Sequence, residues 1–316
     1  MLGLLRIVTY CLVVTLSYGA QAQPKYPSQT VRLVVPFPAG GQTDIVARLI
    51  ADDLSRSFNA AFIVENVTGA SGNIGTTMVE RAQPDGHTLL VVPPSFVTNL
   101  LAQKAIQKLD AWQPITVAGT VPYLLVAGPQ GKAATIGELI ASARSRPGEV
   151  SYASSGVGSS SHLCVLAIET LAGVKFAHVP YRGLAPALTD VMNGHVDFIF
   201  DSMATSYPLW KDGKVRVLGT GSHTRVASMP DVPTFGESGL PGFEASTWTA
   251  ILAPPGTPDY LIDVISVAMR AALRKESVVE RMNAMFINVT ALDPAASREF
   301  LKSEASFWGK IDQPAP

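Results

Sequence analysis

Apolar runs alternate with amphipathic stretches along the first third of the chain. Residues 31–37 are nearly all apolar, which is typical of a strand buried on both faces of a sheet. Between residues 45 and 54 the apolar positions recur at helical spacing. Residues 61–66 and 87–92 are two further apolar runs, separated by an amphipathic segment. This order predicts a β-α-β-α-β unit with a parallel sheet and right-handed crossovers.

The middle of the chain repeats this plan. Thr135 and Glu138 have the spacing of a capping box, which predicts the start of a helix. Residues 228–242 are dense in Pro and Gly and predict a surface segment. The predicted strands are residues 150–154, 176–181, 196–200 and 214–221, and the predicted helices begin at Ser161 and Ala185.

The C-terminal part adds a strand and two helices. Residues 247–253 predict a strand, and Pro258 lies in the first turn of the helix that follows. Residues 293–311 predict a terminal helix. Its apolar face consists of Phe300, Leu301, Phe307 and Trp308, for which we expect core packing.

Two α/β units with similar openings predict a two-lobed protein. The chain has 316 residues, more than a single core usually supports. We expect it to cross between the lobes near residues 122–128 and again near residues 247–253, with the C-terminal helices back on the first lobe. The predicted division is residues 1–22 as a signal peptide, 23–124 plus 248–316 as lobe 1, and 125–247 as lobe 2.

The composition excludes several classes of protein. Hydrophobic residues make up 47% of the chain and charged residues 16%. This composition predicts a folded protein with a large apolar core and excludes a disordered chain. The formal net charge is -1, without a basic block. We therefore expect no nucleic-acid partner.

The N-terminal residues have the pattern of a secretory signal peptide. Arg6 precedes an apolar run, and small residues end in Ala20-Gln21-Ala22. A membrane anchor is the alternative, but the run is shorter than the ~20 residues of a span. We expect cleavage after Ala22 and export to the periplasm. Cleavage leaves Cys164 as the one cysteine, so no internal disulfide is possible, and its apolar surroundings predict a buried, inert thiol.

The loop after the first strand is a candidate anion site. It combines a Pro-x-Gly-Gly turn with the start of a helix, where free N–H groups and the helix dipole favour an anion. Helix capping by Thr43 or Asp44 explains part of the pattern but does not require the preceding glycines. The candidate ligand-binding residues here are Phe37, Ala39, Gly40, Gly41, Gln42, Thr43 and Asp44.

A second loop occupies the same position in the second unit. It is rich in Gly and Ser, follows a strand and opens a helix. Such a loop alone is often a flexible connector, but two of them at matching places would face one cleft, because open α/β sheets bind ligands at the carboxyl ends of their strands. The candidates here are Ser154, Ser155, Gly156, Gly158, Ser159 and His162.

Three more segments end strands at the same edge. Ser95 follows the third strand and could reach a ligand. Tyr181 could cover an apolar ligand, Arg182 could meet an anion, and Gly183 begins the next helix. Asp201 could accept a hydrogen bond from the ligand or from the Ser/Thr-rich loop. Arg182 as a solvated loop charge and Asp201 as a helix cap are the alternatives.

Standard enzyme signatures are absent from the sequence. It contains no dinucleotide-binding glycine pattern, no phosphate-binding G-x-x-x-x-G-K-S/T motif and no G-x-S-x-G elbow. The five histidines are scattered, so we expect neither a metal nor a cofactor. A secreted hydrolase that uses Ser159 and His162 remains the alternative, although no orienting acid is evident.

Several segments together resemble the Bug family, the extracytoplasmic solute receptors of tripartite tricarboxylate transporters. They include YPSQTVRLVVPFPAGGQTDIVARLIADDL, YASSGVGSSSHL, HVPYRGLAPALTDVMNGHVDF and LAPPGTP. The resemblance implies a two-lobed α/β periplasmic binding protein of the Venus-flytrap type (type II), without catalysis. It also implies that the carboxylate of an organic acid is held by amides and hydroxyls of Phe37–Asp44 and Ser154–Ser159, often through ordered water. Membrane transporter subunits are the implied partners, and we expect a monomer.

One segment departs from the family pattern. The family usually has a Gly/Thr/Ser-rich segment after the third strand, whereas this chain has Pro93, Pro94 and Phe96. These residues predict a stiffer and more apolar wall, which favours an aromatic or hydrophobic carboxylate over citrate.

Overall fold

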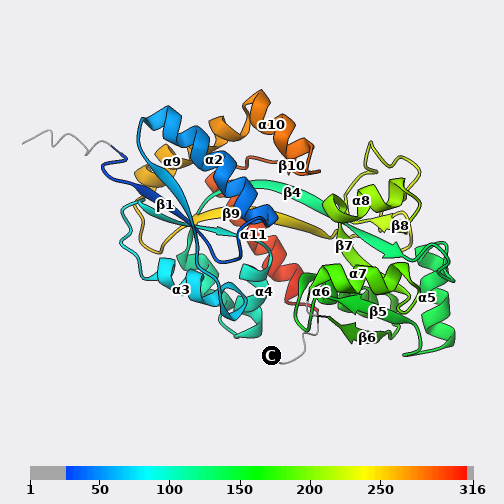
Figure 1. Ribbon diagram of the computed structural model, residues 1–316. Helices are drawn as coiled ribbons and strands as arrows, with labels where there is room; N and C mark the ends of the chain where they lie inside the picture. The colour runs from blue at the N-terminus through cyan, green and yellow to red at the C-terminus, as the bar shows by residue number, and fades with distance from the viewer. Residues whose placement is uncertain (1–25, 182, 312–316) are drawn as a thin grey trace, which may run out of the picture.

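The computed structural model describes residues 26–181 and 183–311. The predicted signal peptide, its cleavage site and Arg182 lie outside the described residues. Figure 1 shows two α/β halves side by side, joined by long strands, and this confirms the two-lobed architecture. Lobe 1 contains β1 (Val31–Val35), α2 (Gln42–Phe58), β2 (Phe62–Asn66), α3 (Asn73–Glu80), β3 (Thr88–Val92) and α4 (Ser95–Ala102), with short 3₁₀ turns at Ala70–Gly72 and Ile106–Ala111.

The remaining elements form the junction, lobe 2 and the C-terminal helices. Lobe 2 contains α5 (Ile136–Ser145), β5 (Ser151–Ser154), α6 (Ser160–Ala172), β6 (Ala177–Pro180), α7 (Leu184–Met192), β7 (Phe198–Ser202), α8 (Met203–Lys211) and β8 (Arg216–Thr220). The junction is made by β4 (Gln113–Ala127) and β9 (Ser246–Ala253), and α9 (Asp259–Leu273), α10 (Glu276–Asn283), β10 (Asn288–Val289) and α11 (Pro294–Trp308) complete the chain.

The strands form a mixed sheet in the order β2-β1-β3-β9-β4-β7-β5-β6, with β10 and β8 also paired to β4. Within lobe 1, β1 runs parallel to β2 and β3, as predicted. Within lobe 2, β5 runs parallel to β6 and β7. The two junction strands are antiparallel to their neighbours, so the sheet is parallel only at its outer parts. The carboxyl ends of β1, β3 and β5 consequently lead into the loops that face the other lobe.

Strand β4 carries the chain from one lobe to the other. As far as Pro122 it pairs with β9, and from Tyr123 onward it pairs with β7 of lobe 2. The return lies at Ser246, where β9 begins. Both points are close to the predicted crossings, while the division into residues 23–124 plus 248–316 and residues 125–247 stays a prediction.

Helix α2 packs on the lobe 1 sheet through the face that its periodicity predicts. Leu49, Ile50 and Leu54 are buried there, and Ile45 is partly buried. In lobe 2, Cys164 is fully buried among apolar side chains, and burial raises the pKa of its thiol. None of the helices in the described ranges is both long and apolar enough to cross a membrane.

Helix α11 reaches further than predicted. Its middle packs on lobe 1 through Leu301, but its last turn belongs to the core of lobe 2. There the Phe307 ring stacks on Phe243 with 6.0 Å between the ring centroids. Sequence periodicity predicts the apolar face of this helix but not which lobe the face meets, so the contact of its last turn with lobe 2 was not predicted.

Candidate functional site

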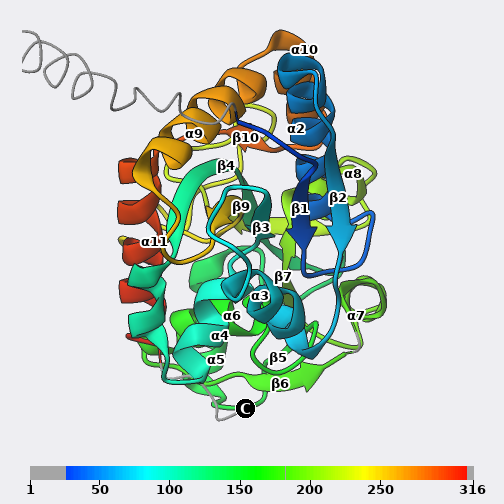
Figure 2. The ribbon, with the colours of Figure 1, turned by 90° about the vertical axis from the view of Figure 1, so that its left-hand side faces the viewer.

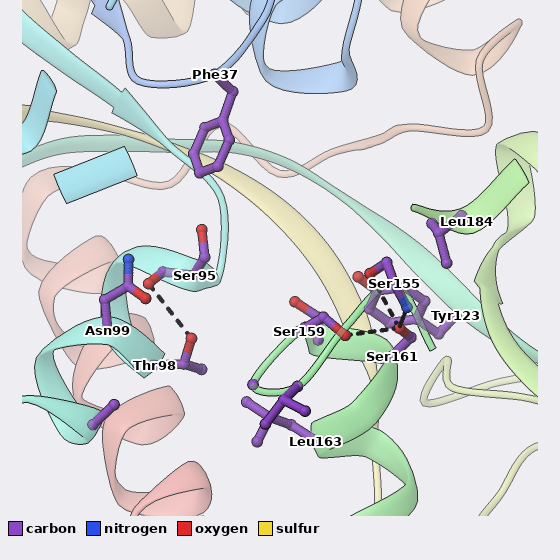
Figure 3. A pocket seen from close by; sticks show the side chains of 14 residues that line it. Phe37, Ser95, Thr98, Asn99, Tyr123, Ser155, Ser159, Ser161, Leu163 and Leu184 are labelled. Atoms are coloured by element: carbon purple, nitrogen blue, oxygen red, sulfur yellow. Dashed lines mark hydrogen bonds between the residues drawn. The ribbon is translucent and has the colours of Figure 1, made fainter. Parts of the chain in front are cut away.

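A cavity of about 430 Å³ lies between the two lobes. Figure 3 shows its lobe 1 side, formed by Phe37 and α4, opposite the β5–α6 loop of lobe 2. The lining residues are Phe37, Ser95, Thr98, Asn99, Ala102, Tyr123, Ser155, Val157, Gly158, Ser159, Ser160, Ser161, Leu163 and Leu184. In the described part of the chain, the lining contains no charged side chain.

The β5–α6 loop is held by its own polar groups. The Ser159 hydroxyl caps α6 by accepting the His162 N–H, and it donates to the Gly156 carbonyl at 2.7 Å. The Ser161 hydroxyl accepts the Ser155 N–H at 3.1 Å. Gly156 has φ 125°, a conformation that side chains rarely tolerate, so the tight turn requires glycine there. The loop is therefore arranged before any ligand arrives.

The first turn of α6 leaves several N–H groups free. Val157, Ser160 and Ser161 have backbone N–H groups without a hydrogen-bond partner among the described residues. No acidic residue lies in this first turn. Free amides, serine hydroxyls and the positive end of the helix dipole together favour an anion in the cavity.

The first candidate loop differs, because an internal carboxylate already occupies it. Asp44 is 2% exposed and accepts the Gly40 N–H at 2.9 Å, and it also bonds to Arg48 and Asn66. Burial alone would raise its pKa, but the hydrogen bonds from Arg48, Gly40 and Asn66 outweigh it and lower the pKa to about 2. A carboxylate of the same helix, that of Asp44, therefore compensates the positive end of the α2 dipole.

Of the residues predicted in this first loop, one lines the cavity. Phe37 projects into it, as Figure 3 shows. Ala39, Gly40 and Gly41 form an exposed turn beside it, and Gln42, Thr43 and Asp44 form the first turn of α2. Gly41 has an ordinary φ of -76°, so its backbone does not require glycine. A ligand contact at the turn stays a prediction.

His162 and Ser159 do not form a nucleophile–base pair in the described structure. The Nδ1 atom of His162 accepts the Gly158 N–H at 3.0 Å, while Ser159 bonds to backbone groups. The His162 ring stacks on His178 at 4.2 Å between centroids. Burial, with a further contribution from His178, lowers the pKa of His162 to about 4, so the ring is neutral at physiological pH.

The remaining candidates lie around the cavity or behind it. Ser154 is fully buried under the loop and bonds to His178 at 2.6 Å. Tyr181 is half-buried and donates to Asp190 at 2.6 Å, which raises its pKa to about 12. Gly183 precedes α7 with φ 118°. These three do not line the cavity.

Asp201 does not reach the cavity either. It is fully buried, and its Oδ2 accepts the Ser206 hydroxyl at 2.5 Å, while Oδ1 has no partner among the described residues. The cap of the following helix is Ser202, so the alternative interpretation of Asp201 as a cap is also wrong. Burial raises the pKa of Asp201 to about 6, ahead of the opposing hydrogen bonds.

The expected apolar wall after β3 is wrong. Helix α4 begins directly after the two prolines, and Phe96 in its first turn faces the core, where its ring lies edge-on to Trp112 with 5.5 Å between the ring centroids. Pro94 is also buried. Ser95 and Asn99, half-buried, present polar groups to the cavity instead. The argument for an aromatic or hydrophobic ligand therefore loses its basis.

Nine lining residues were not among the sequence candidates. Three of them belong to the Gly/Ser loop before α6: Val157, Ser160 and Ser161. Because the first N–H groups of a helix have no partner within it, the predicted helix start could have indicated Ser160 and Ser161. Asn99 follows Ser95 by four residues, so recognition of α4 as a helix would have placed both on one face. The others are Thr98, Ala102, Tyr123, Leu163 and Leu184.

Comparisons with known proteins agree on the family to which the chain is similar. The family model described as "Tripartite tricarboxylate transporter family receptor" matches residues 46–314. Protein BugT of Bordetella pertussis is 33% identical over 290 residues, which cover 90% of this chain and 89% of BugT.

Two solved structures extend the similarity to the fold. Rpa4515 of R. palustris with adipate gives a TM-score of 0.77 at 32% identity and covers 90% of this chain and 97% of its own. MatC (Rpa3494) of Rhodopseudomonas palustris with bound malate gives 0.76 at 32% identity and covers 90% and 99%. The chain therefore belongs to the tripartite tricarboxylate transporter receptors of the Bug type, a family of periplasmic solute-binding proteins.

Proposed function

We propose that this protein captures a small organic carboxylate between its lobes and presents it to the membrane subunits of a tripartite tricarboxylate-type transporter. The observation that carries the proposal is the start of α6, where free N–H groups of Ser160 and Ser161 meet an interlobe cavity. The similar structures with adipate and malate support a carboxylate as the ligand class. The predicted export, cleavage after Ala22 and monomeric state are parts of the same proposal.

The energetics of such a cradle suit a receptor. Hydrogen bonds to a charged acceptor contribute about 1.5–3 kcal/mol each. Three or four of them total roughly 5–12 kcal/mol before the cost of ordering and lobe closure is subtracted, which limits the expected affinity to the micromolar range (about 8 kcal/mol) or weaker. Neutral donors hold the anion without a buried cation, so opening of the lobes releases the ligand readily.

The same geometry supports binding without turnover. The Ser159 hydroxyl is committed to the Gly156 carbonyl, and the acceptor nitrogen of His162 is committed to the Gly158 N–H. A serine hydrolase needs these two groups to bond to each other. The hydrolase alternative would also need a base that titrates near neutral pH, which the lowered pKa of His162 does not provide.

A pair of variants at one position tests the cradle. Ser160→Asp places an internal carboxylate in the first turn of α6, as Asp44 already does in α2. We expect it to abolish binding of organic acids in calorimetry, because its charge occupies the amides and repels the ligand. Ser160→Asn has nearly the same size without the charge and should retain most of the affinity. Equal binding by both variants would place the carboxylate elsewhere.

A further inference from the structure

Tyr123 lies where the cavity meets the junction between the lobes. It is one of the residues that line the cavity (Figure 3). Its backbone belongs to β4, at the point where this strand stops pairing with β9 and begins to pair with β7. Figure 2, seen from the side of lobe 1, shows β4, β9 and β3 next to one another in the middle of the molecule. One residue is therefore part of both the candidate site and the junction.

Backbone hydrogen bonds fix Tyr123 at the junction. Its N–H donates to the Ala245 carbonyl at 2.9 Å, and its carbonyl accepts the Gly221 N–H at 2.8 Å. The Gly221 carbonyl in turn accepts the Ala245 N–H at 3.0 Å. A side chain at Gly221 would collide with the Ala245 carbonyl, so this close approach of the backbones requires glycine. These bonds hold Tyr123 against Ala245, the residue that directly precedes β9.

The side chain of Tyr123 connects the junction to α6. Its hydroxyl bonds to the side chains of Ser160, the first residue of α6, and of Thr247 in β9. Ser160 lines the cavity, whereas Thr247 is not among the described lining residues. Burial raises the pKa of Tyr123, so its hydroxyl keeps the proton and can donate as well as accept. Three hydroxyl groups therefore form a chain that begins at the cavity and ends at the junction.

A carboxylate bound at α6 sets the direction of the hydrogen bonds in this chain. Each hydroxyl has one proton to donate, whereas a carboxylate only accepts. When the Ser160 hydroxyl donates to the carboxylate, the Tyr123 hydroxyl donates to Ser160, and the Thr247 hydroxyl donates to Tyr123. Hydrogen bonds that follow one another in this way polarise and strengthen each other. Binding of the acid and the contact between α6 and β9 consequently reinforce each other.

We propose that Tyr123 is a positioning residue whose hydroxyl couples ligand binding at α6 to β9 at the lobe junction. This inference rests on the proposed receptor function. It has two consequences that a purely structural tyrosine would not have. Thr247 affects affinity although it does not line the cavity, and the bound ligand strengthens the contacts of Tyr123 at the junction.

Variants along the chain of hydroxyls test the first consequence by calorimetry. The probe is the tightest-binding acid of a set that contains adipate, malate, citrate and benzoate. We expect Tyr123→Phe and Thr247→Val each to weaken binding about fivefold, the effect of one ordinary hydrogen bond. The double variant should bind no more weakly than Tyr123→Phe, because either substitution alone already interrupts the chain.

Thr249→Val is the matched control for Thr247→Val. Thr249 lies two residues further along β9, and its buried hydroxyl has no partner among the described residues. The substitution is the same and removes a hydroxyl from the same strand, but outside the chain. We therefore expect Thr249→Val to bind the acid as tightly as the wild type.

Hydrogen exchange tests the second consequence. The acid should slow exchange of the Tyr123 N–H, which is bonded to Ala245, in the wild type and in Thr249→Val. In Thr247→Val the same acid at saturation should slow it less than half as much. Equal slowing in both valine variants would contradict the coupling.

The possible failures are distinguishable. If the wild type binds an acid and neither Tyr123→Phe nor Thr247→Val weakens the binding, the coupling is overturned and the receptor function stands. Losses that add in the double variant, or an equal loss in Thr249→Val, would also overturn the coupling, because the effects would then be independent or would come from packing. If the wild type binds no acid of the set, the proposed function is refuted and the coupling with it.

Discussion

Replacing Asp201 by asparagine should stabilise the protein and leave ligand binding unchanged. The sequence made Asp201 a candidate ligand contact, yet it is 0% exposed and one of its oxygens has no partner among the described residues. Asparagine has the same shape and can still accept the Ser206 hydroxyl. The substitution therefore mimics the protonated aspartic acid and removes a buried charge.

The size of this stabilisation and its dependence on pH follow from the pKa of Asp201. Burial raises the pKa of Asp201 from 3.8 to about 6, so the folded protein holds the proton more tightly than the unfolded chain. Ionised Asp201 therefore destabilises the folded protein. This loss of unfolding free energy is small below about pH 4, grows between the two pKa values and is complete above about pH 6. Two pKa units correspond to about 3 kcal/mol of unfolding free energy. Asp201→Asn should gain up to about that much near pH 8 and little near pH 4.

Chemical unfolding of wild type and variant near pH 8 and near pH 4 measures this difference. Asp212→Asn is the matched control, because it removes the same charge from an exposed side chain and should show no comparable gain. Loss of stability near pH 8, or a gain that does not depend on pH, would refute the account of Asp201 as a buried, poorly compensated charge. A loss of ligand affinity in Asp201→Asn would restore its role as a ligand contact.

Three further predictions concern the loops and the lobe junction. Asp44→Asn should cost about 2 kcal/mol at neutral pH, and the difference should vanish as the pH falls from about 4 to about 2 in unfolding titrations, because the lowered pKa contributes stability only above that window. Phe307→Ala should cost about 2 kcal/mol and speed hydrogen exchange around Phe243, since the stack ties α11 to lobe 2; unchanged exchange there would contradict the tie. His162→Phe should keep the ring stack but weaken ligand binding about fivefold in calorimetry, because the Gly158 N–H loses its acceptor; unchanged affinity would show that this bond does not position the loop.

Local patterns were sufficient to predict much of the fold and one wall of the site. The apolar run of β1, the amphipathic face of α2 and the Gly/Ser turn before α6 each depend on residues close in sequence. The capping box at Thr135 and Glu138 is formed as its spacing predicts. Because residues close in sequence determine these elements, the sequence alone was sufficient to predict them.

The sequence could not indicate features that depend on distant partners. Prolines at positions 114 and 122 suggest interruptions, yet β4 continues through them because the register with β9 shifts after Pro114 and the strand changes partner after Pro122. The sequence indicated Asp44 as a helix cap or a ligand contact but not its side-chain network, because Asn66, which completes that network, lies 22 residues away. Helix α4 was not predicted from the sequence either, because two prolines directly precede Ser95, where the helix begins.

An experimental structure of the wild-type protein with its natural ligand tests the central claim most directly. The ligand is first identified by mass spectrometry of small molecules released from the native protein. We expect an organic acid in the interlobe cavity, with one carboxylate within hydrogen-bonding distance of the Ser160 and Ser161 N–H groups. A carboxylate paired instead with Arg182, with the amides of α6 left without a ligand contact, would contradict the account.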